Sequence, residues 1–120
     1  MTEMIQMKFA RGDSYERGFL VNDKESGQPV TDPFDEIYFT VKKYCSTETE
    51  FKFQKRMSTG GIVDDGEGHY TLYINPEDTN NLPFGKYDCD IELVKDGGQY
   101  KRTFFGTLEL TKEVTYSENE

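Results

Sequence analysis

The sequence predicts an all-β protein, an antiparallel β-sandwich of about seven strands with one short helical turn near residues 76–81. Val, Ile, Tyr, Phe and Thr, which favour strands, make up 40 of the 120 residues, whereas Ala, the strongest helix former, occurs once. Apolar and polar residues alternate along most of the chain, and turn residues interrupt the alternation roughly every 8–15 positions. Two packed sheets, each with one wet face, fit this pattern. A closed barrel is the alternative architecture.

The first half of the chain contains four expected strands, which are separated by turns rich in Gly, Asn, Asp and Ser. Their core-facing residues are Ile5, Met7 and Phe9; Tyr15, Arg17, Phe19 and Val21; Ile37, Phe39 and Val41; and Phe51 and Phe53. The fourth of these strands is expected over residues 49–56.

The second half contains three further strands. Their core-facing residues are Tyr70, Leu72 and Ile74; Tyr87, Cys89, Ile91 and Leu93; and Tyr100, Arg102, Phe104, Gly106, Leu108 and Leu110. The short segment 62–63 would add an eighth strand if it pairs. Asn75 and Pro76 predict a helical turn between the first two of these strands, because Asn caps helices and Pro fits the first helical position.

The length of the chain is that of a single domain, which we expect over residues 1–112, followed by a polar, flexible tail over residues 113–120. Fourteen basic and 23 acidic residues give a net charge of −9. This charge argues against nucleic acid and against an anionic membrane surface as partners. The sequence shows no signal peptide and no apolar run of about 20 residues, so we expect the protein to be made in a cytoplasm.

Candidates for chemistry are few, and we expect no catalytic residue, no metal and no cofactor. His69 is the single histidine, and the acids beside Cys89 disfavour a thiolate. Cys45 and Cys89 are expected to be reduced thiols, with a disulfide or a reactive site as the alternative, and with one His they fall short of a zinc site. Acidic corners at residues 32–36 and 64–67 are interpreted as solvated loops, with a weak calcium site as the alternative.

Four aromatic residues fall on expected outward positions. They are Tyr38, Tyr44, Tyr73 and Phe105. Large aromatic side chains dominate the energetics of protein interfaces, so these four are the candidate interaction surface. Cross-strand pairing within a sheet is the alternative use for the same side chains.

An ordered set of short motifs resembles a known family. The motifs are the segment Tyr70–Thr79 with its Pro-Glu-Asp-Thr sequence, Leu82–Leu93 with Gly-x-Tyr-x-x-Asp-Ile-x-Leu, Arg11–Asp13, Ile37–Lys43 and Gly106–Leu110. Together, over roughly residues 9–115, they resemble small Ig-like β-sandwich proteins of tailed phages and prophages. The nearest family is the N-terminal domain of the phage baseplate upper protein.

The resemblance implies a non-enzymatic virion component that is made in the bacterial host cytoplasm and attaches to other structural proteins of the tail, baseplate or appendage, with self-association as a further possibility. The sequence is also similar to immunoglobulin domains around Tyr87 and Cys89, where a tyrosine corner is expected. The Trp of those domains is missing, and Cys45 lies on the wrong strand for their disulfide. A carbohydrate- or cell-surface-binding module remains the alternative function.

Overall fold

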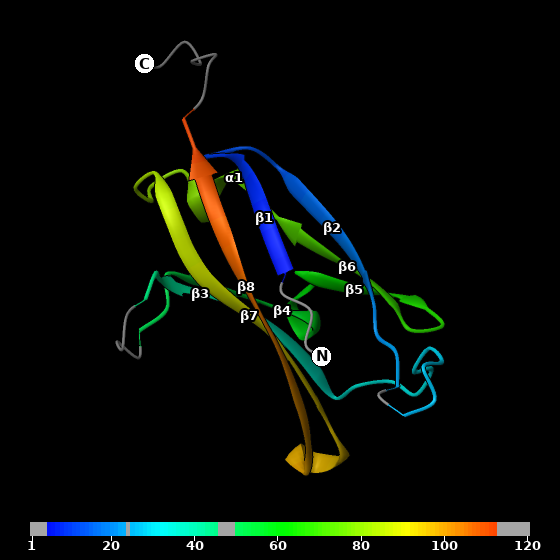
Figure 1. The fold of residues 1–120 in the computed structure, drawn as a ribbon. Coiled ribbons are helices and arrows are strands. Elements are labelled where there is room, and N and C mark those ends of the chain that lie inside the picture. Colours follow the sequence, from blue (N-terminus) through cyan, green and yellow to red (C-terminus); the bar gives the residue numbers. More distant parts are fainter. Residues whose placement is uncertain (1–4, 24, 46–49, 113–120) are drawn as a thin grey trace.

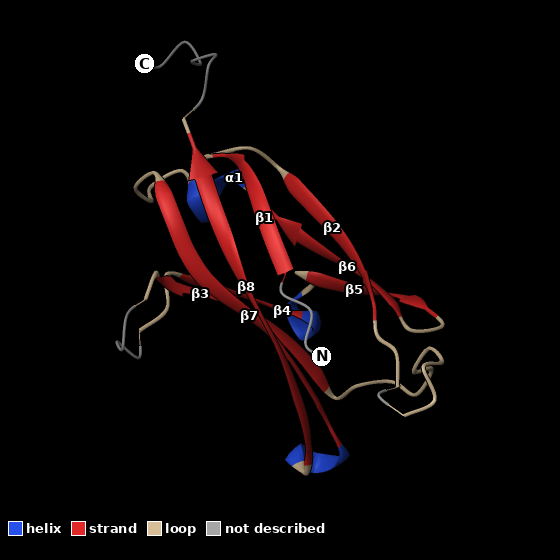
Figure 2. Cartoon of the chain, viewed as in Figure 1, coloured by secondary structure: helices blue, strands red, loops and turns tan. Residues whose placement is uncertain are grey.

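Eight strands form the two layers of a β-sandwich, and strands account for 58% of the residues (Figure 2). This computed structural model describes residues 5–23, 25–45 and 50–112. The strands are β1 (Ile5–Ala10), β2 (Tyr15–Leu20), β3 (Glu36–Lys43), β4 (Phe53–Arg56), β5 (Ile62–Gly66), β6 (His69–Ile74), β7 (Gly85–Lys95) and β8 (Tyr100–Thr111). One helical turn, α1 (Pro76–Thr79), and two 3₁₀ turns, η1 (Met57–Thr59) and η2 (Asp96–Gly98), complete the elements.

The larger sheet has five strands in the order β1-β8-β7-β3-β4, and the smaller has three in the order β2-β6-β5. The two sheets face each other in Figure 1, and the long β7–β8 hairpin extends past both of them at one end. Because two separate sheets pack on one core, the sandwich is confirmed over the barrel.

The core lies between the sheets and is built from the alternating positions that the sequence predicted. Ile37, Phe39 and Val41 of β3 are fully buried, as are Leu72 on β6 and Leu108 on β8. Each of these strands shows alternation of buried and partly exposed residues, because successive side chains point to opposite faces of a sheet. The hydrophobic pattern therefore sets the orientation of nearly every strand.

The strand order agrees with an Ig-like sandwich. In immunoglobulin letters, β2, β6 and β5 occupy positions B, E and D, while β3, β7 and β8 occupy C, F and G. The Tyr87 hydroxyl near the start of β7 donates a 2.6 Å hydrogen bond to the Pro83 carbonyl, four residues upstream. This is the expected tyrosine corner, which ties the loop before β7 to the core.

The helical turn is also found where it was expected, although it ends at Thr79. The Asp78 N–H donates to the Asn75 carbonyl at 3.0 Å, and the Asp78 carboxylate accepts from the Asn75 N–H at 2.8 Å. The same carboxylate forms a 2.8 Å ion pair with Lys55, which fixes the turn to β4. The buried Thr79 hydroxyl accepts a 2.8 Å hydrogen bond from the Gly12 N–H, so α1 also holds the β1–β2 connection.

One pairing corrects the expectation of a purely antiparallel sandwich. β1 pairs with β8 in parallel, with Ile5 opposite Gly106 and Ala10 opposite Thr111. After β1 the chain crosses to the smaller sheet through the turn at residues 11–14, so β1 and β2 do not form a hairpin within one sheet. The alternation of side chains could not show this, because it is the same for parallel and antiparallel neighbours. Residues 62–66 pair with β6 as strand β5, so this short segment adds a strand to the seven that the sequence predicted.

The inward placement of Phe51 is a second expectation that was wrong. A bend at Lys52 shortens the fourth strand to Phe53–Arg56 and breaks the alternation before Phe53. Phe53 is buried as expected, whereas Phe51 is 51% exposed. The beginning of the predicted strand and the predicted tail at 113–120 lie outside the described residues.

Candidate functional site

The candidate site is the solvent-facing side of the five-stranded sheet, which we call the outer sheet face. It is formed by the outward side chains of its five strands. These are Gln6, Lys8 and Ala10 of β1; Lys101, Thr103, Phe105, Thr107, Glu109 and Thr111 of β8; Lys86, Asp88, Asp90, Glu92 and Val94 of β7; Glu36, Tyr38, Thr40 and Lys42 of β3; and Gln54 and Arg56 of β4.

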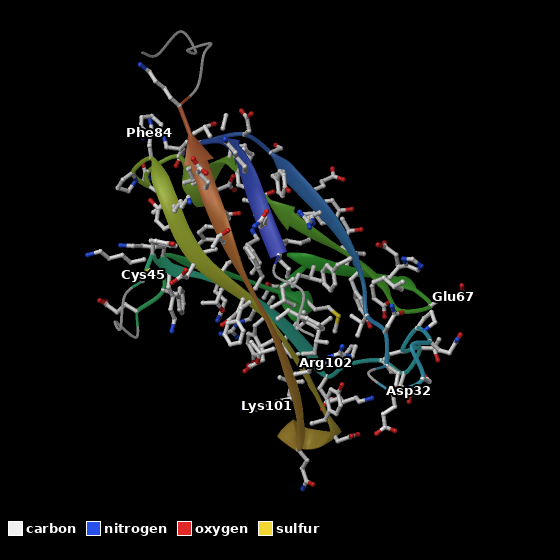
Figure 3. The ribbon with its side chains drawn as sticks, in the orientation of Figure 1. Asp32, Cys45, Glu67, Phe84, Lys101 and Arg102 are labelled. Atoms are coloured by element: carbon white, nitrogen blue, oxygen red, sulfur yellow. The ribbon has the colours of Figure 1, made fainter. Side chains whose placement is uncertain are left out.

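The outer sheet face is electrically balanced, although the protein is not. It carries five basic residues and five acidic ones, out of 14 and 23 in the whole sequence. Among the described residues outside the face, eight are basic and 13 are acidic, and one further basic and five further acidic residues lie outside the described part of the chain. Much of the acidic excess lies on the loop between β2 and β3 and on the β5–β6 hairpin, where Figure 3 shows Asp32 and Glu67 on the side away from Cys45.

A shallow hollow of about 580 Å³ lies on this face. Its lining residues are Tyr38, Thr40, Lys42, Phe51, Gln54, Arg56, Asp90, Glu92, Val94 and Lys101. A second depression of about 340 Å³ shares Thr40, Lys42 and Asp90 with the first and is also lined by Phe105. The aromatic side chains of β3 and β8 therefore belong to one continuous surface.

Hydrogen bonds between side chains hold one wall of the hollow in place. Arg56 Nε donates to Gln54 Oε1 at 3.1 Å, and Gln54 Nε2 donates to Thr40 Oγ1 at 3.0 Å. The guanidinium carbon of Arg56 lies 5.2 Å from the centre of the Tyr38 ring, within the range of a cation–π contact. This row places an aromatic ring, an amide and a guanidinium side by side with little remaining freedom.

The surroundings of Asp90 on this face shift the pKa of its carboxyl upward. Burial raises the pKa of the Asp90 carboxyl, the neighbouring Glu92 adds to the rise, and Lys42 opposes it. Burial has already removed part of the water around the ionised Asp90 carboxylate. A cation on a partner would therefore displace little water when it contacts this carboxylate.

The structure brings three of the four predicted aromatic residues to this side of the molecule. Tyr38 lines the hollow, and Phe105, which is 59% exposed, stands opposite Asp90 on the neighbouring strand. Tyr44 follows the end of β3 and is 44% exposed. Contact with Cys45 raises the pKa of Tyr44, with a smaller effect from Asp88, whose carboxylate accepts the Cys45 N–H at 2.9 Å.

Tyr73 is separate from the other three, because it lies on β6 in the smaller sheet, opposite Glu16. It lines another depression with Gly60 and Gly61. Phe51 belongs to the hollow but was missed, since the alternation with Phe53 placed it in the core. No signal in the sequence marks the bend at Lys52 that turns it outward.

A cleft of about 380 Å³ opens between the sheets, beside the start of β1. Its walls include the apolar side chains of Ile5, Phe19, Ile91 and Phe104. The one ionisable residue among its lining residues, Arg17, donates from Nη1 to the Gln6 carbonyl at 2.8 Å. A cleft lined in this way offers apolar contact and no acid–base pair.

The groups weighed for chemistry differ in their burial and in their protonation. Burial, together with the flanking Asp90 and Asp88, raises the pKa of the Cys89 thiol to about 12, so it is protonated at neutral pH. Cys45 is an exposed free thiol, and His69 is exposed on β6. Within the described residues, no three His, Cys, Asp or Glu side chains gather as metal ligands would. In the acidic corners, Asp32, Asp35, Asp64, Asp65 and Glu67 are exposed, and the second corner includes the end of β5.

Comparison with known proteins adds no relative. No protein-family model matches the chain, and no curated protein matches its sequence. Among residues 5–23, 25–45 and 50–112, no helix is long and apolar enough to cross a membrane.

Proposed function

We propose that this chain is a non-enzymatic assembly module of a tailed phage or prophage particle, which binds another structural protein of the virion through its outer sheet face. The observation that carries the proposal is a charge-balanced, aromatic sheet face on a sandwich whose other described residues include 13 acidic and eight basic side chains. The phage context is supported by the resemblance of the sequence motifs. The expected location is therefore the virion, in its tail, baseplate or appendage.

The face has the composition of a protein interface. Tyr38 and Phe105 supply apolar area on the face, Phe51 adds to the hollow beside the edge strand β4, and charged residues line the same depressions. Aromatic residues and Arg are the side chains that contribute most to binding when a partner excludes water from them. The acidic loops beyond the face would speed the approach of a basic partner, because complementary charge raises association rates more than affinity.

The test is to co-express the chain with the products of the neighbouring genes and to measure the mass of the purified complex by light scattering. Phe105→Glu places a charge at the exposed centre of the face and should abolish a complex. Leu20→Glu is the matched control, because Leu20 is 43% exposed on the smaller sheet. A complex that Leu20→Glu breaks and Phe105→Glu leaves intact would contradict this choice of surface, and no complex with any neighbour would contradict the function.

A carbohydrate-binding module is the second candidate, favoured by one observation. Tyr38 and Phe51 line the same hollow as Thr40, Gln54 and Arg56, so aromatic rings lie beside hydrogen-bonding groups that suit sugar hydroxyls. Calorimetry with polysaccharides from bacterial surfaces tests it. Binding that Tyr38→Ala removes would favour this function, whereas an absence of heat alongside a protein complex would leave the assembly function.

A further inference from the structure

We propose that the first half of β8 is a docking site for an extended segment of a partner protein, which adds to the five-stranded sheet as a further strand. The expected segment carries an apolar side chain and an acidic side chain two residues apart. This site is separate from the outer sheet face, so it goes beyond the proposed function and stands or fails without it. An open length of strand edge, an incomplete core beside it and a buried cationic group without a partner all lie there.

β8 is longer than the strand that covers its edge. β1 pairs with Gly106–Thr111, and within the described residues no strand pairs with the first half of β8 on that side. Figure 1 shows β1 beside only the half of β8 that ends nearest the C-terminus. The Thr111 carbonyl accepts from the Arg11 N–H at 3.1 Å, so the odd-numbered residues of β8 turn their backbone groups to this side. Lys101 and Thr103 therefore present N–H and C=O groups along the open edge.

The core is incomplete along the same stretch. The inward-facing positions level with β1 are buried, whereas Phe104, the next one along the strand, is only partly buried. The buried positions are Gly106, Leu108 and Leu110. The cleft of about 380 Å³ between the sheets opens here, and Phe104 and Ile5 are among its lining residues. A strand added to β8 in line with β1 would direct every second side chain into this cleft, where an apolar side chain at the level of Phe104 would complete the core.

Two arginine side chains link the larger sheet to β2 and to the residues just after it. Arg17 of β2 donates to the Gln6 carbonyl of β1 at 2.8 Å. Arg102 of β8 donates from Nη1 to the Asn22 carbonyl at 2.6 Å, but its buried Nε has no hydrogen-bond partner among the described residues. The guanidinium carbon of Arg102 lies 4.7 Å from the centre of the Phe104 ring. A carboxylate two positions from the apolar side chain of an added strand is therefore placed to accept from this Nε.

The same features select the class of partner. A small apolar molecule could fill the cleft, but it would make no use of the backbone groups of Lys101 and Thr103, whereas a peptide strand pairs with them. A basic side chain would meet the positive charge of Arg17 and Arg102, so an acidic one is favoured. The open edge covers five residues, 101–105, which at about 3.3 Å each span about 17 Å, the length of an ordinary strand.

The test titrates the isotopically labelled whole chain with the blocked pentapeptide Thr-Glu-Thr-Ile-Thr and follows the backbone amides by NMR. We expect saturable binding that shifts the amides of Lys101 and Thr103. At saturating peptide, hydrogen exchange of the Thr103 amide should slow at least about tenfold, because that N–H gains a strand partner. The matched peptide Thr-Lys-Thr-Ile-Thr should bind at least about tenfold more weakly, because its side chain cannot accept from Arg102.

Two proline variants test the open edge itself. Proline has no N–H, so Thr103→Pro should leave the chain folded and abolish peptide binding, because this N–H faces the open side. Thr107→Pro is the matched control, since Thr107 belongs to the same odd-numbered series but lies where β1 covers β8. That variant should melt at a clearly lower temperature than Thr103→Pro. Equal melting temperatures would show that the Thr103 N–H is already bonded in the free chain, and would overturn the proposal.

If strain at the new proline lowers the stability of Thr103→Pro as well, hydrogen exchange in the original chain decides. Fast exchange of the Thr103 amide supports an open edge, and slow exchange without peptide overturns it. Failure of the pentapeptide to bind, or binding that leaves the amides of Lys101 and Thr103 unshifted, overturns strand addition. Equal affinity for the two peptides overturns the role of Arg102. The proposed function fails separately, if Phe105→Glu leaves a complex with a neighbouring gene product intact.

Discussion

Gly106→Ala tests the parallel pairing of β1 with β8, which is the least expected feature of the fold. Gly106 is buried on the core side of β8, opposite Ile5. A Cβ added there would lie 2.8 Å from the Ile5 Cβ and would collide with the Ile5 carbonyl group. These are atoms at or next to the backbone of an edge strand, so a change of rotamer cannot relieve the contact. β1 must move away from β8.

The magnitude follows from two opposing effects. Forcing one extra carbon into a filled site costs about 1–3 kcal/mol, whereas Gly→Ala stabilises by about 0.4–1 kcal/mol by reducing the freedom of the unfolded chain. We expect a net loss of about 1–2 kcal/mol. Gly18→Ala is the matched control, because the nearest atom to its added Cβ, the Tyr70 carbonyl oxygen, is 3.8 Å away. That variant should be about 0.4–1 kcal/mol more stable than the original chain.

Urea denaturation measures both variants under one set of conditions, and an unchanged m value shows that only stability has shifted. Amide hydrogen exchange adds the location, since protection should fall in β1 and in the paired half of β8 for Gly106→Ala. If Gly106→Ala were as stable as the original chain, β1 would not approach β8 as closely as described here. If Gly18→Ala lost as much stability as Gly106→Ala, the contact with Ile5 would not be the cause.

Three further predictions concern the core and the outer sheet face. Tyr87→Phe removes the hydrogen bond to Pro83 and should cost about 0.5–1.5 kcal/mol in thermal unfolding, so an unchanged melting temperature would argue against the tyrosine corner. Ile91→Ala should lower the free energy of unfolding by about 2–5 kcal/mol, whereas Phe51→Ala should change it by no more than about 0.5 kcal/mol. Equal losses would show that Phe51 is buried in the core. Asp90→Asn should raise the melting temperature at pH 7, because burial and a neighbouring carboxylate raise the folded-state pKa of Asp90 above 3.8 and so disfavour its charge. As the pH falls through the raised pKa, the folded original chain binds its proton first and regains stability, so the advantage of Asn should shrink, and a constant advantage would refute this cause.

The sequence was informative wherever one side chain reports on its own environment. Alternation identified the buried residues of β3, β6, β7 and β8, and local turn chemistry located α1 at Asn75 and Pro76. Such patterns depend on burial and on backbone preferences of single residues, which act over a few positions. Tyr38, Tyr44 and Phe105 were recognised as outward-facing for the same reason.

What the sequence could not show depends on contacts between distant segments. β1 pairs in parallel with β8 because the chain crosses to the other sheet after β1. A glycine is needed at position 106 only because β1 lies so close to it. The bend at Lys52 accompanies a 2.6 Å hydrogen bond from its N–H to the Val41 carbonyl, which no local pattern announces. Phe51 therefore follows the inward-facing pattern in the sequence but faces solvent in the fold.

The charge balance of the outer sheet face is itself a consequence of topology. Alternation alone shows that Lys8 and Arg56 point outward, but it does not say that both strands flank β8, β7 and β3. Had β1 paired with β2 in the smaller sheet, Lys8 would have been removed from this face, and the five acidic residues would have outnumbered the basic ones. The parallel pairing thus contributes the fifth basic residue to the face. For this reason a test of the β1–β8 contact also tests the charge balance of the outer sheet face, on which the proposed function rests.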